Sequence, residues 1–208
     1  DLVKLTEIIE GNFNYNENSF KARIKRIGES IVSLIIIIIS LPILIIASIL
    51  IKLEDGGPII YTQTRNGFEG KEFKIIKLRT MIINAEINGE QWSMRSDKRI
   101  TKVGNILRKT SLDELPQFLN VLKGEMSIVG PRPLFDEDTK LFDKSYMRRL
   151  NVLPGITGLL QINERNTSEF STWYKYDIEY IENWSLYLDL KIIFKTPLSL
   201  LKGRAKGL

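Results

Sequence analysis

The sequence contains neither cysteine nor histidine. Without these residues the chain has no disulfide, no thiolate nucleophile, no Cys/His zinc site and no iron–sulfur cluster. Ser-His-Asp and Cys-His catalysis and imidazole proton transfer are excluded as well. Any catalytic chemistry must therefore come from carboxylates, lysine, arginine, hydroxyl groups or a metal ion bound by oxygen ligands.

The 208 residues are enough for one ordinary domain, or for a small domain with an appendage. Hydrophobic residues make up 43% of the chain, which is sufficient for a packed core. Lys and Arg number 30 against 25 Asp and Glu, so the net charge is +5. These values indicate a folded, basic protein and argue against wholesale disorder.

One uncharged run, IVSLIIIIISLPILIIASILI, occupies residues 31–51. As an α-helix it is about 31 Å long, close to the thickness of the hydrocarbon core of a bilayer. A signal peptide fits poorly, because Lys52-Leu53-Glu54-Asp55 follows the run where a small-residue cleavage site is expected. We therefore predict a membrane segment, with a fully buried core helix as the alternative.

Basic residues flank the run on both sides, and the positive-inside rule places both flanks in the cytoplasm. Pro42 predicts a bend near the midpoint, and the Ser40 hydroxyl can satisfy part of the interrupted hydrogen bonding. A re-entrant hairpin that returns to the cytoplasmic face fits these features, and an ordinary spanning helix containing proline remains the alternative. The flanking residues are Lys21, Arg23, Lys25 and Arg26 before the run, and Lys52, Arg65, Lys71, Lys74, Lys77 and Arg79 after it.

The rest of the chain is predicted to be α/β and mostly helical. A turn at Asp55-Gly56-Gly57-Pro58 precedes two β-like runs, 59–64 and 72–81, with Asn66-Gly67 between them. Helical patterns follow at 101–109, 112–122, 136–150, 168–183 and 186–201. The last is amphipathic, so it either packs on the core or lies in a membrane interface.

We accordingly divide the chain into three parts. Residues 1–21 are a linker or the remnant of a longer chain, residues 22–54 form the membrane segment, and residues 55–208 form a small catalytic domain with a short β-hairpin.

Two adjacent carboxylates, Asp113 and Glu114, follow Ser111 in the pattern of a helix capping box. Capping alone would explain them, but a helix start also presents free N–H groups that suit a phosphate and its metal ion.

Arg132 lies in the rigid loop Gly130-Pro131-Arg132-Pro133, which favours planar recognition of phosphate. The surrounding cations are Arg95, Lys98, Arg99, Lys102, Arg108, Lys109, Lys123 and, beyond a second Pro-Gly loop at 154–158, Arg165. Carboxylates and arginines beside a membrane, without histidine, point to phosphoryl transfer with a divalent cation.

Three motifs carry a resemblance to a known family: LDELPQ at 112–117, NVLKGEMS at 120–127 and VGPRP at 129–133. Together with shorter matches at 55–58, 77–81, 154–158 and 189–191, they resemble the bacterial sugar transferase family. These proteins are monotopic polyprenyl-phosphate glycosyl-1-phosphate transferases, or phosphoglycosyl transferases, which initiate exopolysaccharide, O-antigen and N-glycan assembly. The resemblance covers roughly residues 22–200, and it also implies that the membrane segment is a re-entrant helix–break–helix.

The resemblance implies that Asp113 is a nucleophile and that Glu114, with Asp113, holds Mg²⁺. Asp113 would attack a nucleoside-diphosphate sugar, release a nucleoside monophosphate, and pass the phospho-sugar to polyprenyl (undecaprenyl) phosphate. The implied location is the cytoplasmic face of the bacterial inner membrane, with membrane lipids and no nucleic acid as partners, and homo-oligomer formation left open. The implied phosphate-binding residues are Arg108, Arg132 and Arg165, with Lys77 and Arg79 as further candidates.

Two positions depart from the family pattern. The Ser-Pro of the membrane break reads Ser40-Leu41-Pro42, and an Asn-Gly-Arg motif reads Asn163-Glu164-Arg165. The added glutamate places bulk and negative charge where a phosphate or sugar would approach.

Two other functions remain as alternatives. Asp136-Glu137-Asp138 is a D-x-D sequence, by which metal-dependent glycosyltransferases that release a nucleoside diphosphate hold their cation. Acidic residues that open a helix explain the same sequence. The second alternative is a non-catalytic, membrane-anchored scaffold that uses its basic surface to hold anionic lipid.

Overall fold

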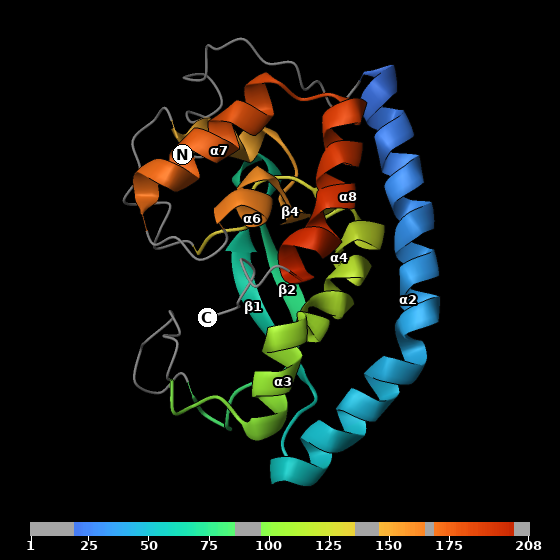
Figure 1. Cartoon of the computed structure of the whole chain (residues 1–208), viewed down its shortest axis with the longest axis vertical. Helices are drawn as coiled ribbons and strands as arrows, with labels where there is room; N and C mark the ends of the chain where they lie inside the picture. Colours follow the sequence, from blue (N-terminus) through green and yellow to red (C-terminus); the bar gives the residue numbers. More distant parts are fainter. Residues whose placement is uncertain (1–18, 86–96, 136–145, 165–168, 202–208) are drawn as a thin grey trace.

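A computed structural model describes residues 19–85, 97–135, 146–164 and 169–201. One long N-terminal helix runs along the side of a body built from shorter helices and two two-stranded sheets (Figure 1). This agrees with the predicted mostly helical class and its short β-hairpin. In chain order, with η marking 3₁₀ helices, the elements are α2 (Phe20–Asp55), β1 (Ile60–Asn66), η1 (Phe68–Gly70), β2 (Glu72–Leu78), α3 (Lys102–Thr110), η2 (Leu112–Gln117), α4 (Phe118–Lys123), β3 (Ser127–Val129), η3 (Tyr146–Asn151), β4 (Gly155–Thr157), α6 (Leu159–Glu164), α7 (Phe170–Glu182) and α8 (Leu186–Leu201).

Helix α2 contains 36 residues and has a defined cap at each end. The hydroxyl of Ser19 accepts a hydrogen bond from the Ala22 amide at 3.2 Å. At the other end Gly56 has a φ of 72°, the left-handed conformation that glycine adopts without steric cost. The helix continues through Pro42, so the predicted break is a change of direction within one helix (Figure 1). The Ser40 hydroxyl donates to Ile37 at 3.1 Å, not to the Ile38 carbonyl that Pro42 leaves without its usual donor.

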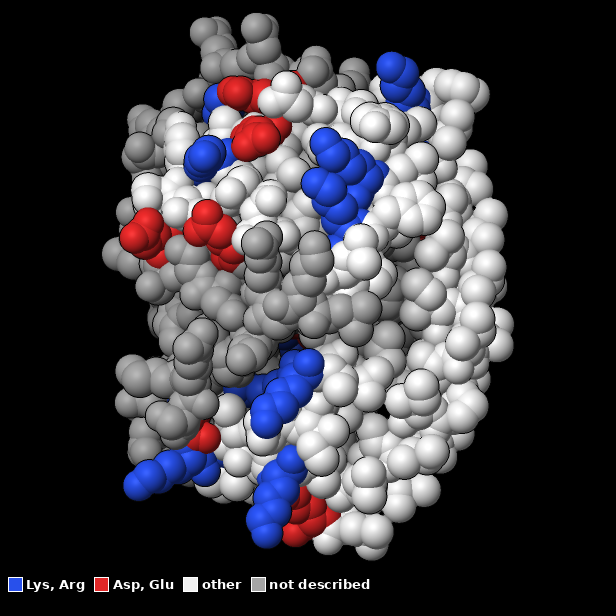
Figure 2. Space-filling view, viewed as in Figure 1, with Lys and Arg blue, Asp and Glu red and all other residues white. Residues whose placement is uncertain are grey.

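A single stripe of α2 packs against the body. Its buried residues recur every three, four or seven positions, which is the spacing of one helical face. Most of the large apolar side chains outside the stripe are exposed, and only 17% of the most apolar window is buried. The alternative of a fully buried core helix is therefore wrong, and Figure 2 shows the edge formed by α2 almost free of charge. The stripe consists of Ala22, Lys25, Glu29, Ser33, Ser40, Ala47 and Ile51.

The predicted β-hairpin is present. Strands β1 and β2 pair antiparallel from Ile60 opposite Leu78 to Asn66 opposite Glu72. Strand β2 ends at Leu78, three residues earlier than predicted, and Met81 instead forms an isolated bridge with Ile100.

A second sheet, formed by β3 and β4 in parallel, was not predicted from the sequence. Each strand has three residues, too few to show an alternating pattern. Glycines let the flanking loops approach closely, since a Cβ on Gly155 would lie 2.1 Å from the Gly130 nitrogen.

The helix predictions were largely confirmed, with three exceptions. Helices α3, α7 and α8 match the predicted ranges to within two residues. The range 112–122 instead divides into η2 and α4, with Pro116 inside η2, and α6 was missed. Of the predicted helix 136–150, only 146–150 is described, and it is 3₁₀. Residues 1–18 of the predicted linker lie outside the described residues.

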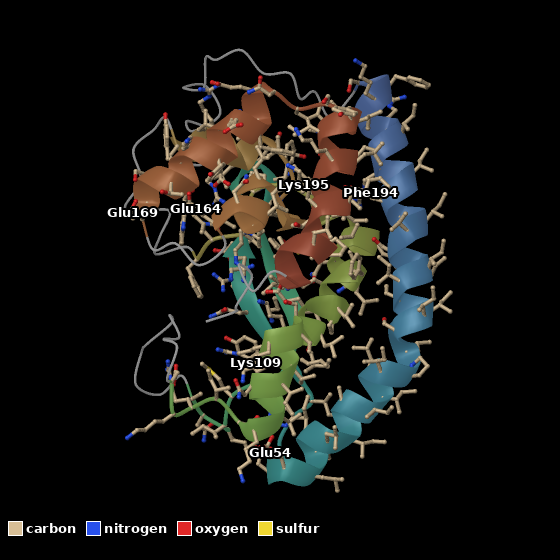
Figure 3. All side chains as sticks on the ribbon, viewed as in Figure 1. Glu54, Lys109, Glu164, Glu169, Phe194 and Lys195 are labelled. Carbon is tan, nitrogen blue, oxygen red and sulfur yellow. The ribbon has the colours of Figure 1, made fainter. Side chains whose placement is uncertain are left out.

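Two apolar clusters hold these elements together. The larger one joins β2, α4, β3, α7 and α8 through buried residues such as Phe73, Val121 and Ile192. The smaller one joins α2 to β2 and α3 through Ala47, Ile51, Leu78 and Leu107. At this end the Glu54 carboxylate also accepts from the backbone amides that begin α3 (Figure 3). Helix α2 is thus fastened to the body at its C-terminal end by both packing and hydrogen bonds.

We expect Gly104→Ala to destabilise the protein by about 2–3 kcal/mol, because the new methyl group would lie 2.0 Å from the Thr80 carbonyl oxygen. The matched control is Gly28→Ala, where no atom lies within 4 Å and helix propensity predicts a gain of about 0.5–1 kcal/mol. Thermal unfolding of both variants in one detergent measures the difference. A melting temperature of Gly104→Ala equal to that of the unsubstituted protein would contradict this packing.

Candidate active site

The two adjacent carboxylates lie where the chain turns from α3 into η2. Ser111, between the two helices, has a φ of 57° and caps the C-terminus of α3. Its side chain makes no capping hydrogen bond to η2, so the predicted N-cap role of Ser111 is wrong. An N-cap residue needs extended backbone, which a left-handed residue does not have. The turn buries Asp113, which is 8% exposed.

Glu114 is held by cations from two distant parts of the chain. The Lys77 ammonium, on β2, donates to Glu114 Oε1 at 3.0 Å. The Arg132 guanidinium donates to the same oxygen at 3.2 Å. The Glu114 carboxylate thus contacts both the hairpin and the loop after β3.

Lys77 lies partly buried beside both carboxylates. Burial lowers the pKa of its ammonium, while the negative charges of Glu114 and Asp113 oppose that shift. The Lys77 side chain is 18% exposed. It therefore supplies a positive charge at a fixed place next to the pair, in surroundings where little water screens it.

Arg108, on the last turn of α3, is the third cation. Its Nε donates to the Thr80 hydroxyl at 2.8 Å. Burial lowers the pKa of its guanidinium, and the charge of Asp113 is the largest opposing influence. Arg108 therefore lies within electrostatic reach of Asp113.

The loop that carries Arg132 is fixed on several sides. Prolines precede and follow the arginine, and its carbonyl oxygen accepts from Arg149. Arg149 in turn pairs with the buried Asp177. The Arg132 side chain contacts Glu114, and because it is 41% exposed it also faces solvent.

The described structure does not place two of the predicted phosphate-binding residues, Arg79 and Arg165, beside Asp113 and Glu114. Arg79 turns away to Asp55, at the end of α2, and also donates to the carbonyls of Pro58 and Met81. Arg165 lies outside the described residues, as does the D-x-D sequence at 136–138.

Sequence reasoning missed two residues that support the site. Thr80 holds Arg108, as described above. Asn120, which is fully buried, accepts from the Ile76 amide at 3.0 Å and donates to the Lys74 carbonyl at 2.8 Å. It thereby fastens α4 to the strand that carries Lys77. Its signal in the sequence is a lone amide among the apolar residues of the helix.

The site also lies next to the membrane-type helix. Leu112, which immediately precedes Asp113, packs in the small cluster with Ala47 and Ile51 of α2. The carboxylate pair is thus placed beside the C-terminal half of the apolar helix.

The arrangement suits charge neutralisation of a phosphorylated ligand. Three cations converge on two carboxylates, and the oxygen donors fit a hard cation such as Mg²⁺, which binds one or two carboxylates together with substrate phosphates. The described residues contain no group of three or more acidic side chains that could hold a metal ion on its own. The two carboxylates alone fit a metal ion that arrives with its ligand.

Comparison with known proteins gives one family. The model of the family described as bacterial sugar transferase matches residues 20–203. The exopolysaccharide production protein ExoY of Sinorhizobium fredii is 40% identical over 187 residues, covering 83% of either chain. The UDP-glucose:undecaprenyl-phosphate glucose-1-phosphate transferase of Klebsiella pneumoniae is 44% identical over 187 residues, 86% of this chain and 40% of the relative. The UDP-N-acetylgalactosamine-undecaprenyl-phosphate N-acetylgalactosaminephosphotransferase of Aeromonas hydrophila is 40% identical, covering 88% and 44%.

The Asp55–Arg79 pair predicts a specific dependence of stability on pH. The hydrogen bond from Arg79 lowers the pKa of Asp55 to about 2, from 3.8. A lowered carboxyl pKa means that the pair stabilises the fold above about pH 4 and loses this contribution as the pH falls toward 2. The difference in unfolding free energy between the unsubstituted protein and Asp55→Asn should therefore shrink on acidification, as measured by urea unfolding at several pH values. A difference that stays constant across this range would disprove the linkage.

Proposed function

The chain belongs to the bacterial sugar transferase family, and on that basis we propose that it transfers a sugar-1-phosphate from a nucleoside-diphosphate sugar to membrane polyprenyl phosphate. The relatives from Klebsiella and Aeromonas are named for such transfers to undecaprenyl phosphate. The observation that carries the proposal is the Asp113–Glu114 pair, which lies beside Lys77, Arg108 and Arg132.

Asp113 is the proposed nucleophile. Its carboxylate attacks the phosphorus next to the sugar, the bond to the nucleoside monophosphate breaks, and a mixed anhydride carries the phospho-sugar. An oxygen of polyprenyl phosphate then attacks the same phosphorus and displaces the Asp113 carboxylate, giving polyprenyl-diphosphate sugar. Dividing the transfer in this way lets a soluble donor and a lipid acceptor use one site in turn.

The three cations have distinct proposed roles. Arg132 is partly exposed, so its guanidinium is the one best placed to meet an incoming diphosphate. Arg108 and Lys77 are more deeply buried and lie on the Asp113 side and the Glu114 side of the pair. Because protein contacts already fix all three, little reorganisation is needed as charge develops during the transfer.

Glu114, with Asp113, is the proposed ligand pair for Mg²⁺. When bound, Mg²⁺ neutralises the diphosphate and stabilises charge on the leaving phosphate. Lys77 and Arg132 hold the Glu114 carboxylate at a fixed position and so prepare it for a cation.

We propose that α2 is re-entrant and that the body, residues 55–208, lies on the cytoplasmic face of the bacterial inner membrane. In support, the buried stripe of α2 runs from Ala22 to Ile51 along one body, so both ends of the helix contact that body. A free-standing span would separate those ends by a bilayer. Exposed basic residues at both ends, Lys21, Arg23 and Lys52, favour the cytoplasmic side for each.

The decisive experiment supplies the protein in lipid nanodiscs with undecaprenyl phosphate, Mg²⁺ and a panel of labelled nucleoside-diphosphate sugars. We expect release of a nucleoside monophosphate and a polyprenyl-diphosphate sugar. Asp113→Asn should lower the rate by a factor on the order of 10³ or more. Glu72→Gln, an exposed carboxylate on β2, is the control and should be fully active.

Other products would overturn this proposal. Release of a nucleoside diphosphate indicates a glycosyltransferase of the D-x-D kind, whereas full activity of Asp113→Asn removes the nucleophile from the mechanism. Incubation with donor alone should add the mass of one sugar phosphate to the unsubstituted protein and none to Asp113→Asn.

Chelation of divalent cations should abolish turnover, and added Mg²⁺ should restore it, because two carboxylates and a diphosphate together carry more negative charge than the three cations balance. Glu114→Gln should raise the Mg²⁺ concentration needed for half-maximal nucleoside monophosphate release by at least about tenfold. Undiminished turnover in excess chelator would rule out the metal.

A further inference from the structure

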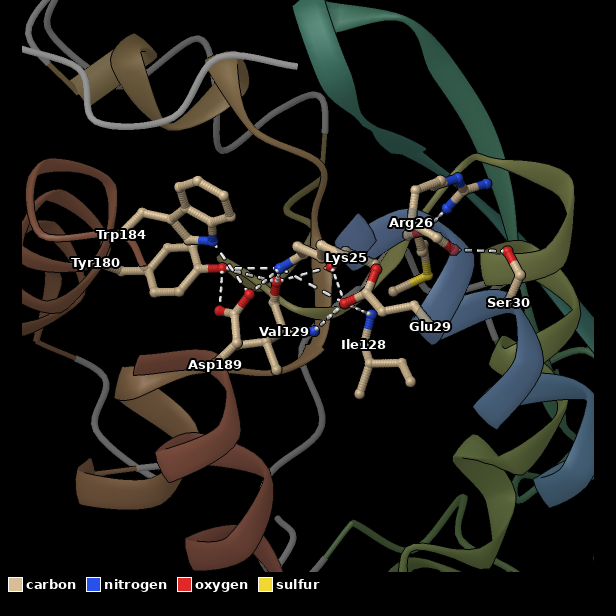
Figure 4. A network of polar contacts seen from close by, with 11 residues as sticks. Lys25, Arg26, Glu29, Ser30, Ile128, Val129, Tyr180, Trp184 and Asp189 are labelled. Carbon is tan, nitrogen blue, oxygen red and sulfur yellow. Dashed lines mark hydrogen bonds and ion pairs between the residues drawn. The ribbon is translucent and has the colours of Figure 1, made fainter. Parts of the chain in front are cut away.

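A second buried polar cluster lies away from the carboxylate pair, where α2 meets β3, α7 and α8 (Figure 4). At its centre the Lys25 ammonium donates to Asp189 Oδ2 at 2.7 Å, to the Val129 carbonyl at 3.0 Å and to the Tyr180 hydroxyl at 3.1 Å. The Trp184 indole and the Tyr180 hydroxyl also donate to Asp189.

The Glu29 carboxylate supplies hydrogen-bond acceptors along one edge of β3, where a neighbouring strand would otherwise supply them. Its Oε1 accepts from the Ser127 hydroxyl at 2.6 Å and from the Ile128 amide at 3.0 Å. On the opposite edge of β3, the amides of Ser127 and Gly130 donate to Pro154 and Thr157 of the second sheet. A three-residue strand is thus held on one edge by β4 and on the other by a carboxylate from the membrane-type helix.

Strand β3 leads directly into the loop that carries Arg132. Only two residues, Gly130 and Pro131, separate Val129 from Arg132. The Gly130 amide donates to Thr157 at 2.9 Å, and the Pro131 carbonyl accepts from Gly155 at 2.8 Å, so this link has little freedom of its own. We therefore expect a shift of β3 to move Arg132 relative to Glu114.

Arg26 adds a second hold on the same segment. Its guanidinium donates to the carbonyls of Val121 and Met126, the end of α4 and the residue before β3. Lys25 and Arg26 were counted above as basic flanks of the membrane run. The structure shows them turned into the body, where they bind the segment that leads to Arg132.

From these contacts we propose that Glu29 is a positioning residue for Arg132, so that the membrane helix sets the geometry of the active site as well as the location of the protein. This proposal rests on the transferase activity proposed above. Glu29 acts through hydrogen bonds that its carboxylate accepts along β3.

A double-mutant cycle with Arg132 tests the proposal. Glu29→Ala should lower kcat/KM for the sugar-nucleotide donor about 10- to 100-fold, because small misplacements of a catalytic group cost this much. In an Arg132→Ala background the same substitution should cost no more than about twofold, since the group that it positions is absent. Glu29→Gln, which still presents an acceptor oxygen to Ser127 and Ile128, should stay within about fivefold of the unsubstituted protein.

Lys21→Ala is the control, an exposed charged residue about two turns before Glu29 on α2. It should leave turnover, membrane flotation and the melting temperature unchanged. If Glu29→Ala does not fold, Ser127→Ala removes one of the same hydrogen bonds and should give a smaller loss that also vanishes in the Arg132→Ala background. Equal losses in both backgrounds, or no loss in a folded variant, would overturn the proposal.

Hydrogen–deuterium exchange provides a measurement that does not depend on activity. The amides of residues 127–130 should exchange faster in Glu29→Ala, and at the original rate in Lys21→Ala. Unchanged exchange in Glu29→Ala would refute the positioning role. A lack of nucleoside monophosphate release by the unsubstituted protein would instead refute the transferase proposal, so the two failures are distinguishable.

Discussion

The pairing of Glu114 with Lys77 and Arg132 is the interaction on which the candidate site depends. One carboxylate oxygen receives a cation from the β-hairpin and a cation from the loop after β3, and these parts of the chain are more than fifty residues apart. The Glu114 side chain is only 12% exposed, so removing either cation would leave its carboxylate with less compensation for the water it has lost. The three-way contact therefore joins the hairpin, the turn after α3 and the arginine loop into one arrangement.

Three further side chains hold this charged centre in place. Thr80 fixes Arg108, Asn120 fixes the strand that carries Lys77, and Arg149 binds the backbone of Arg132. None of the three supplies chemistry of its own. Asn120 and Arg149 act by bonding the backbone of another part of the chain, whereas Thr80 bonds the Arg108 side chain.

Helix α2 combines two surfaces with different requirements. Its outer face is apolar, as lipid requires, whereas its inner stripe includes Lys25, Glu29 and Ser33. The charged members of that stripe are partnered in the body, where they hold β3 and α8. A membrane anchor with only an anchoring role would have no need of buried charges, so this inner stripe shows that the helix is an integral part of the folded domain.

The sequence by itself determined the class of chemistry, the position of the apolar helix, the hairpin turn and the family. The absence of histidine and cysteine limited the chemistry, the apolar run located α2, and Asn66-Gly67 located the hairpin turn. The motifs around Asp113 and Arg132 led to the family that the comparisons then established. These features are local, so a window of ten or twenty residues contains them.

Only the tertiary structure decided the remainder. A capping-box pattern predicted that Ser111 begins a helix, but the left-handed backbone that ends α3 leaves its side chain without that role. Lys77 lies on β2 and Arg79 immediately follows that strand, and both were predicted as phosphate ligands, yet Arg79 turns to Asp55 and Lys77 to Glu114. The partners of Lys25 and Glu29 lie about a hundred residues or more away. Which carboxylate a cation meets depends on how distant segments pack, and that information is not contained in the spacing of neighbouring residues.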